Sequence, residues 1–276
     1  MEILQKYKKE IDAYLAAYLS SKEKDFARVN AWGPDALNKI QSVVSEGKTI
    51  RGSLVLLIHD VLKGKNKNSA LRVAAAYELI QTGLVIHDDI MDHDSMRRGK
   101  PTMQVQYKSE AMAMCVGDIL FFLAHELLDE SPVQKISAQI FQEVGIAQMQ
   151  DVSFSLTDNI PSKEEIIALY KYKTARYTFA LPMMAGALLA GADKTTVKQL
   201  EQLGENMGIL FQIQNDTLNV KGDIREGKKT LARLYAPVEP DLKTYYKNAL
   251  KSLGILNRII DTTALENLLT YITTHE

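Results

Sequence analysis

The chain has 276 residues, of which 46% are hydrophobic and 24% are charged, and its formal net charge is −1. This composition supplies enough apolar surface for a substantial core, and the near-zero charge argues against a general nucleic-acid binder. The single cysteine, Cys115, excludes an internal disulfide and a metal site built from cysteines alone, and it fits a reducing compartment.

The first segment, residues 1–15, is amphipathic and charged. It lacks the apolar core of a signal peptide. No uninterrupted apolar run along the chain is long enough to span a bilayer. We therefore expect a cytoplasmic protein that does not insert stably into a membrane.

Apolar residues recur at helical spacing along most of the chain, as in Val73, Tyr77, Ile80 and Leu84. Three further segments are rich in residues that favour helices: 133–156, 163–190 and 195–220. Polar, Gly and Pro clusters break the pattern at 63–68, 97–101, 129–132, 158–162, 190–193 and 237–240. No hairpin signal separates alternating strands, and no linker divides the chain. The sequence predicts one all-α domain, residues 1–276, made of long, tightly packed helices.

An acidic cluster, DDIMD, follows an apolar predicted helix at residues 88–92. At about 100° per residue, Gln81, Asp88 and Asp92 fall within about 40° of one another on one helix face. Two carboxylates one turn apart beside a core repel each other unless a cation lies between them. Mg²⁺ prefers such oxygen ligands and completes its shell with water and substrate phosphates. This cluster therefore predicts a magnesium site.

Two arginines, Arg97 and Arg98, follow the acidic cluster. They would suit a diphosphate, because guanidinium groups bind its oxygens in a fork. The competing interpretation is a solvated helix end with ordinary surface charge, since a DDxxD string alone is weak support for a metal site. An EF-hand is excluded, because the glycine and terminal glutamate that it requires are missing.

A second polar cluster places Gly204, Gly208, Gln212 and Asp216 at intervals of four residues. Two glycines on one face allow another helix to approach closely. The polar groups that follow either serve a site or form a network between packed helices. The nearby GDIREGKK, residues 222–229, does not form a P-loop, because the Ser or Thr that binds Mg²⁺ and the preceding strand are both absent.

Together these motifs resemble those of the trans-isoprenyl diphosphate synthases, the polyprenyl synthetase family. The matching motifs occur in order: GKxxR (47–51), a glutamine seven residues before DDxxD (88–92), RRGKP (97–101), GD (117–118), KT (173–174), FQxQ (211–214) and EGKKTL (226–231). The resemblance implies an all-α fold around a deep central cavity, usually as a homodimer. Such an enzyme joins isopentenyl diphosphate to an allylic diphosphate, head to tail, with Mg²⁺.

The resemblance also implies a role for each matching residue. The metal ligands would be Asp88, Asp92, Asp89 in an assisting role, Asp216 and Asn215. The catalytic group would be Lys173, which also holds the allylic diphosphate, with Thr174 and Gln212 lining the place where the carbocation forms. Arg97 would also hold the allylic diphosphate, and Lys228 would close over it. Phe211 would be a further substrate-binding residue. The residues that bind isopentenyl diphosphate would be Lys48, Arg51, Gln81 and Arg98.

The main departure from the family pattern lies in the second acidic motif, which is usually DDxxD. Residues 215–219 are NDTLN, so Asn215 stands where the family usually carries a metal ligand. The loop that follows and the tail after Lys228 are also shorter than usual. An amide offers Mg²⁺ an oxygen but no charge. We therefore expect a weakened third metal site.

Product length in this family often depends on the two residues four and five positions before DDxxD, here Leu84 and Gly83. Farnesyl-producing members tend to place an aromatic ring there, which forms the floor of a tunnel for the growing chain. A glycine blocks nothing, so we expect a tunnel that extends toward Ile80 and the helix holding Met112–Cys115. The expected product is geranylgeranyl diphosphate or a longer polyprenyl diphosphate.

Two other functional classes stay open. The chain could be a weak or non-catalytic regulatory subunit of a heteromeric synthase, although its first motif and basic residues are complete. It could also be a class I terpene synthase, which shares the helical fold but needs no isopentenyl diphosphate site. The presence of Lys48, Arg51, Gln81 and Arg98 argues against the second alternative.

Overall fold

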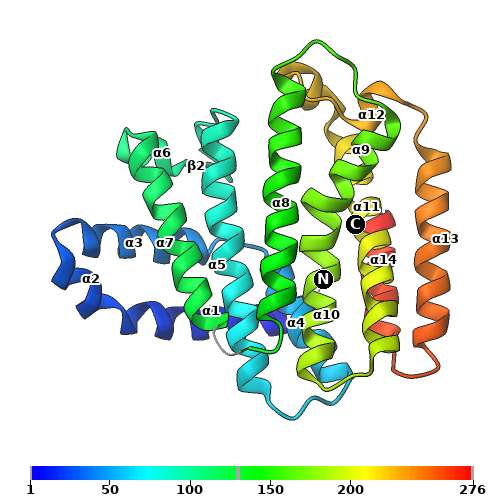
Figure 1. Cartoon of the computed structure of the whole chain (residues 1–276), viewed down its shortest axis with the longest axis horizontal. Coiled ribbons are helices and arrows are strands. Elements are labelled where there is room, and N and C mark those ends of the chain that lie inside the picture. Colours follow the sequence, from blue (N-terminus) through cyan, green and yellow to red (C-terminus); the bar gives the residue numbers. More distant parts are fainter. Residues whose placement is uncertain (1, 129–130, 275–276) are drawn as a thin grey trace. The chain divides into compact units, whose positions relative to one another are not determined.

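The computed structural model describes residues 2–128 and 131–274 (Figure 1). Helices make up most of these residues, and strands within them are limited to β1 (Met96–Arg97) and β2 (Lys100–Pro101). The all-α prediction is therefore confirmed.

By its internal contacts the chain forms two compact units. The N-terminal unit comprises Glu2–Leu56 and Lys67–Ser131, and the C-terminal unit comprises Leu57–Asn66 and Pro132–Glu276. The expected single domain around a central cavity stays a prediction.

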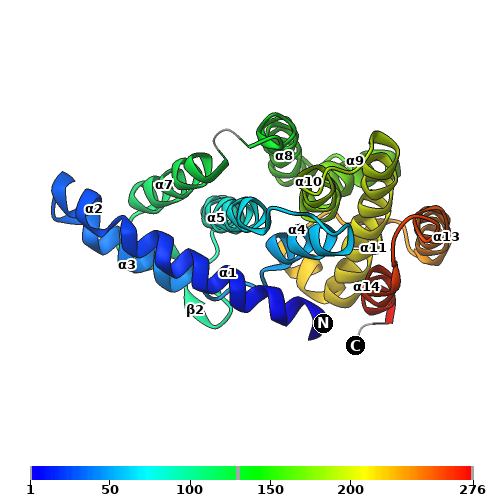
Figure 2. The same cartoon turned by 90° about the horizontal axis from the view of Figure 1, so that it is seen from below.

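The N-terminal unit is built around one long helix, α5 (Lys67–Met91), whose alanine-rich centre is buried. α7 (Glu110–Leu128) packs on one side of α5, and α1 (Glu2–Ser21) and α3 (Trp32–Val44) pack on the other (Figure 2). The remaining helices of this unit are α2 (Glu23–Val29), the first half of α4 (Ile50–Val61) and α6 (Met103–Tyr107).

Glycines allow α5 and α7 to approach closely. A Cβ atom on Gly83 would lie 2.7 Å from the Phe121 ring and 3.0 Å from the Gly117 carbonyl oxygen. A Cβ on Gly117 would in turn lie 2.3 Å from the His87 ring. The expectation that Gly83 leaves a tunnel open is therefore wrong, because Phe121 of α7 occupies the space beside it.

α7 is the one helix, among residues 2–128 and 131–274, that is long and apolar enough to cross a membrane. Length and composition alone are weak support for such a span, since core helices of soluble proteins share both. One face of α7 packs against α5 near Gly117, and Leu120 and Ala124 are buried.

A short hairpin follows α5 and carries both predicted diphosphate-binding arginines. Arg97 pairs with Lys100 across β1 and β2, and the two residues between them, Arg98 and Gly99, have φ angles of 53° and 78°. Positive φ at both positions is the geometry of a tight two-residue hairpin. The sequence indicated only a break here, because arginine is an uncommon residue at positive φ.

The C-terminal unit is built around α11 (Lys194–Glu226), which packs against η1 (Tyr170–Ala180), α10 (Leu181–Leu189), α13 (Glu239–Leu256) and α14 (Thr263–Thr274) (Figure 1). α8 (Gln134–Ser155) packs against η1. Two short helices, α9 (Lys163–Leu169) and α12 (Leu231–Leu234), complete the described elements.

The predicted helix over 163–190 is divided into three segments, α9, η1 and α10, and η1 is a π-helix. π-helical segments are rare and occur frequently at functional sites. η1 packs closely on α11, because a Cβ on Gly208 would lie 2.3 Å from the Ala175 Cα and one on Gly204 would lie 2.5 Å from the Ala180 Cα. The predicted close approach of a helix to these two glycines is confirmed.

Candidate active site

The first acidic motif lies at the C-terminal end of α5. The helix ends at Met91, but the amide of Asp92 donates to the carbonyl of Asp88 over 2.8 Å, so the helical turn continues between them. The Asp88 side chain is half-buried and that of Asp92 is exposed. The turn therefore presents two carboxylates at adjacent positions of one face, as the sequence predicts.

Asp89 lies on a different face of α5 and is buried. Arg97 donates from Nε to Asp89 Oδ1, and from Nη2 to Asp94 Oδ2 over 3.1 Å. Burial raises the pKa of Asp89 to about 6, although the nearby Arg97 charge opposes the change. The predicted assisting metal ligand is thus bound to the arginine that was predicted to hold the diphosphate.

A cavity of about 360 Å³ in the N-terminal unit collects several of the predicted substrate-binding residues. Gln81, Arg97 and Arg98 all line it. Lys48 and Arg51 do not: Lys48 is exposed in the turn before α4, and Arg51 is half-buried in the first turn of that helix. The structure therefore places three of the predicted diphosphate-binding residues in one cavity.

Sequence reasoning missed Glu78, which also lines this cavity and is buried. Its Oε1 accepts a hydrogen bond from the Gly52 amide over 2.8 Å. Burial raises the pKa of Glu78, and the Arg51 charge opposes this effect. The sequence feature that could have identified Glu78 is its charge on an otherwise apolar predicted helix, one turn before Gln81. Glu78 fixes the first turn of α4, and with it Arg51, to α5.

The second acidic motif forms part of a hydrogen-bond chain in the C-terminal unit. The Thr174 hydroxyl donates to Gln212 Oε1 over 3.1 Å, and Gln212 Nε2 donates to Asp216 Oδ1 over 2.7 Å. The other oxygen of Asp216 accepts a hydrogen bond from the Tyr170 hydroxyl. Burial raises the pKa of Asp216 to about 6, although the bonds from Tyr170 and Gln212 oppose the change. The structure therefore joins the predicted pair Thr174 and Gln212 to Asp216.

Asn215 and Asn219 lie on the exposed side of α11, away from the buried Asp216. The Asn219 side-chain amide donates to Asp223 Oδ1 over 3.0 Å. Asn215 thus presents an amide where the motif usually carries a carboxylate, as the sequence predicts.

The other predicted residues of this unit occupy separate places. Lys173 Nζ lies 2.5 Å from Asp151 Oδ2 of α8. The Phe211 ring packs against the Phe179 ring with their centroids 5.5 Å apart. The Lys228 side chain is exposed just after α11.

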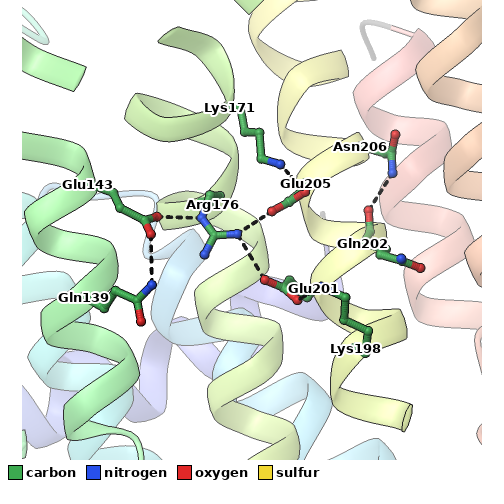
Figure 3. Close-up of polar contacts among 9 residues, drawn as sticks. All are labelled: Gln139, Glu143, Lys171, Arg176, Lys198, Glu201, Gln202, Glu205 and Asn206. Carbon is green, nitrogen blue, oxygen red and sulfur yellow. Dashed lines mark hydrogen bonds and ion pairs between the residues drawn. The ribbon is translucent and has the colours of Figure 1, made fainter. Parts of the chain in front are cut away.

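Arg176, to which the sequence assigned no role, is the centre of an ion-pair network (Figure 3). Its guanidinium group contacts Glu143 at 2.6 Å, Glu201 at 3.1 Å and Glu205 at 2.5 Å. These carboxylates come from α8 and α11, so Arg176 joins η1 to both helices. No signal in the sequence could show this convergence of charges.

The donor set of the first motif suits Mg²⁺. Among the residues the structure describes, no three His, Cys, Asp or Glu side chains form a group that could hold a metal unaided. Mg²⁺ commonly uses one or two carboxylates and takes its other ligands from water and substrate phosphates. The carboxylates of Asp88 and Asp92, one turn apart at the end of α5, fit this pattern.

Comparisons with known proteins identify the family of the chain. The chain matches the polyprenyl synthetase family over residues 35–249. It is 33% identical to a short chain isoprenyl diphosphate synthase of Methanocaldococcus jannaschii, over 92% of this chain and 77% of that protein. It is 36% identical to a geranylgeranyl diphosphate synthase of Sulfolobus acidocaldarius, over 76% of this chain and 68% of that protein.

The fold is also shared with a solved structure. A geranylgeranyl pyrophosphate synthase of Corynebacterium glutamicum, complexed with isoprenyl diphosphate and magnesium, aligns with a TM-score of 0.84 over 99% of both chains, at 23% identity. Because the family match covers most of the sequence and the ordered motifs fall within or beside it, this chain belongs to the polyprenyl synthetase family and is a prenyltransferase.

Proposed function

We propose that the protein condenses isopentenyl diphosphate with an allylic diphosphate, head to tail, in a reaction that requires Mg²⁺. The observation that carries this proposal is the cavity in the N-terminal unit that collects Gln81, Arg97 and Arg98, on the helix end whose last turn carries Asp88 and Asp92. A cavity with two guanidinium groups suits a diphosphate. The family membership supplies the class of reaction.

The first step breaks the C–O bond of the allylic diphosphate, and the departing diphosphate keeps the electron pair. Arg97 and Lys173 would stabilise the charge that develops on this leaving group more strongly than they stabilise the intact substrate. Asp88 and Asp92 would hold Mg²⁺, which when bound neutralises charge on the diphosphate oxygens. Lys228 would add a further positive charge to this group.

The second step forms the new C–C bond. Lys48, Arg51, Gln81 and Arg98 would hold isopentenyl diphosphate, so that its alkene meets the allylic carbocation and supplies the bonding electron pair. The Thr174 hydroxyl and the Gln212 amide would face that cation with their dipoles. A proton then leaves the adjacent carbon and is taken by the departed diphosphate, so no protein nucleophile is needed.

For the product we propose geranylgeranyl diphosphate or a longer chain. The support is the similarity to a geranylgeranyl diphosphate synthase at 36% identity. Gly83 no longer supports this length, because Phe121 fills the adjacent space. If a ring limits the chain at this level, it is that of Phe121, contributed by α7 instead of α5.

The test is to incubate the pure protein with Mg²⁺, isopentenyl diphosphate and each allylic diphosphate in turn, and to identify the products by mass. Each substrate alone and a reaction with chelator serve as controls. A prenyl diphosphate longer by one or more five-carbon units supports the proposal. A hydrocarbon formed from an allylic diphosphate alone would show a terpene synthase instead.

A second candidate function is a weak or regulatory subunit of a heteromeric synthase. The observation that favours it is the second acidic motif, where Asn215 carries no charge and both oxygens of Asp216 already accept hydrogen bonds. The same assay separates the two candidates. No product from the pure chain, together with a changed product length when it is added to an active synthase, would support the subunit.

We also propose a homodimer that acts in the cytoplasm. On α8, Ile146 and Met149 are 69% and 73% exposed and lie one turn apart. Large exposed apolar side chains on one face are typical of protein interfaces. Sedimentation equilibrium of the wild type and of Ile146→Glu tests the assembly. If the two proteins have the same mass, a dimer that uses this face is contradicted.

A further inference from the structure

Tyr170 lies at the start of η1 and is buried in an apolar cluster with Ile166, Ile213 and Leu231. Its hydroxyl group makes two hydrogen bonds inside this cluster. It donates to Asp216 Oδ2, and it accepts from the backbone amide of Leu231 over 2.8 Å. A single side chain thus connects α11 with the first residue of α12.

The amide of Leu231 needs this acceptor. Leu231 is the first residue of α12, and the first amides of a helix have no partner within the helix. Leu231 is also fully buried, where an unpaired amide is costly. The hydroxyl proton goes to Asp216, which leaves the oxygen lone pairs for Leu231.

The Asp216 end of the connection leads to the predicted catalytic pair. Asp216 Oδ1 accepts from Gln212 Nε2 over 2.7 Å, and Gln212 Oε1 accepts from the Thr174 hydroxyl over 3.1 Å. Each member orients the next, because an amide that donates to a carboxylate must turn its oxygen the other way. The orientation of the Gln212 oxygen toward Thr174 therefore depends on Asp216.

The Leu231 end leads to the segment that carries Lys228. This segment is bound to the end of α11, since the Lys228 amide donates to the Asp223 carbonyl over 2.9 Å and the Thr230 hydroxyl donates to Asp223 Oδ2 over 3.2 Å. The bond from Leu231 to Tyr170 attaches it in addition to η1, the helix that carries Lys173 and Thr174.

We propose that Tyr170 is a positioning residue for prenyl transfer. It fixes the position of the Thr174–Gln212–Asp216 hydrogen-bond chain relative to the segment 227–231. This proposal rests on the proposed function. It also gives Asp216 a structural task, with both carboxylate oxygens occupied by protein donors, in place of direct metal binding.

The main test compares Tyr170→Phe with Tyr172→Phe. Tyr172 lies two residues further along the same helix and is 39% exposed, so its variant controls for the loss of a tyrosine from η1. We expect Tyr170→Phe to lower kcat by about tenfold or more, with the KM values for both substrates nearly unchanged. We also expect faster hydrogen exchange at the Leu231 amide, and wild-type behaviour from Tyr172→Phe.

Wild-type kcat together with wild-type exchange at Leu231 in the Tyr170→Phe protein would overturn the proposal. A wild type that forms no prenyl product would reject the proposed function instead, and the exchange measurement would still decide whether Tyr170 holds the segment. The two failures are therefore distinguishable.

Asp216 variants give an independent test if Tyr170→Phe folds poorly. In Asp216→Asn the side-chain oxygen can still accept from the Tyr170 hydroxyl, because an amide keeps one acceptor. We expect this variant to retain much more activity than Asp216→Ala, with the Mg²⁺ concentration for half-maximal rate close to that of the wild type. A rise of about tenfold or more in that concentration would identify Asp216 as a metal ligand and overturn the proposal.

Discussion

Replacing Arg176 by methionine should destabilise the C-terminal unit. Methionine keeps the length and apolar character of the side chain but removes the charge that three carboxylates share (Figure 3). Lys171 would still pair with Glu205, and Lys198 with Glu201, but the charge shared by all three glutamates would be gone. The Arg176 side chain is only 13% exposed and the three glutamates are 14–22% exposed, so water can replace the lost charge only in part.

The magnitude follows from this burial. Removing one partner of a buried ion pair typically costs about 3–5 kcal/mol, because it leaves an uncompensated charge. Since the groups retain some exposure, we expect the lower end, about 3 kcal/mol. For a chain of this size that corresponds to a fall in Tm of about 5–10 °C. The Tm of Arg176→Lys should lie between those of the wild type and Arg176→Met, because an ammonium group cannot reproduce the fork that contacts three carboxylates.

Thermal unfolding followed by circular dichroism measures the effect. The matched control is Arg28→Met, because Arg28 is 81% exposed, lies 3.4 Å from Asp25, and forms the kind of surface pair that contributes little. If Arg176→Met shifts Tm no more than Arg28→Met does, then the ion-pair network adds no net stability and the reasoning is refuted.

The pH dependence of the Tm difference between the wild type and Arg176→Met provides a second check. Burial favours a higher pKa for Glu201, but hydrogen bonds from Lys198 and Arg176 outweigh it and lower the pKa. A carboxyl group with a lowered pKa in the folded state contributes stability above its unfolded pKa, which is about 4.3, and loses it as the pH falls through the folded value. The Tm gap between wild type and Arg176→Met should therefore be largest above about pH 5 and shrink below about pH 4. A gap that widens in acid would contradict this assignment.

Three further predictions concern the proposed reaction. Asp88→Ala or Asp92→Ala should lower turnover by several orders of magnitude while the protein stays folded, measured by steady-state rates and circular dichroism; near-normal turnover in a folded variant would remove the metal assignment. Gly83→Phe should mainly lower Tm, with little shortening of the product, because the Cβ alone would lie 2.7 Å from the Phe121 ring. Adding Phe121→Ala should restore part of the lost stability. Wild-type stability with a shorter product would contradict this packing argument. Asn215→Asp should lower the Mg²⁺ concentration for half-maximal rate, and an unchanged value would refute a metal role for this position.

The helical content and the first acidic motif were predictable from the sequence because both depend on local spacing. The i,i+4 placement of Asp88 and Asp92 requires only a helical turn, and one such turn joins them at the end of α5. The close approach of η1 to Gly204 and Gly208 was also predictable, since two glycines one turn apart lack the Cβ atoms that would keep a neighbour away.

Features that depend on a partner distant in the chain were not predictable in this way. The role of Gly83 depends on Phe121, and that of Arg176 depends on carboxylates from two other helices. The hairpin at Met96–Pro101 requires Arg98 to adopt a positive φ, which a residue with a Cβ atom seldom does. The π-helical form of η1 likewise has no local sequence signature.

The second acidic motif shows how a motif match and helical phase can give different answers for one residue. Matching by letter places Asn215 and Asp216 together as metal ligands. On a helix, however, adjacent residues point about 100° apart, so they cannot both face one site with equal ease. Gly208, Gln212 and Asp216 recur every four residues, and Gly208 is the residue on which η1 packs.

The phase therefore already places Asp216 on the packed face of α11, where the structure finds it buried between Tyr170 and Gln212. It places Asn215 on the exposed face, where a ligand can reach its amide oxygen. The position of Asp216 on the helix is therefore a better guide to its role than the motif match, because a buried carboxylate needs hydrogen-bond donors for its oxygens inside the protein. If Tyr170 and Gln212 hold the Asp216 carboxylate in the fold, as we propose, the metal affinity of this motif depends on the uncharged Asn215.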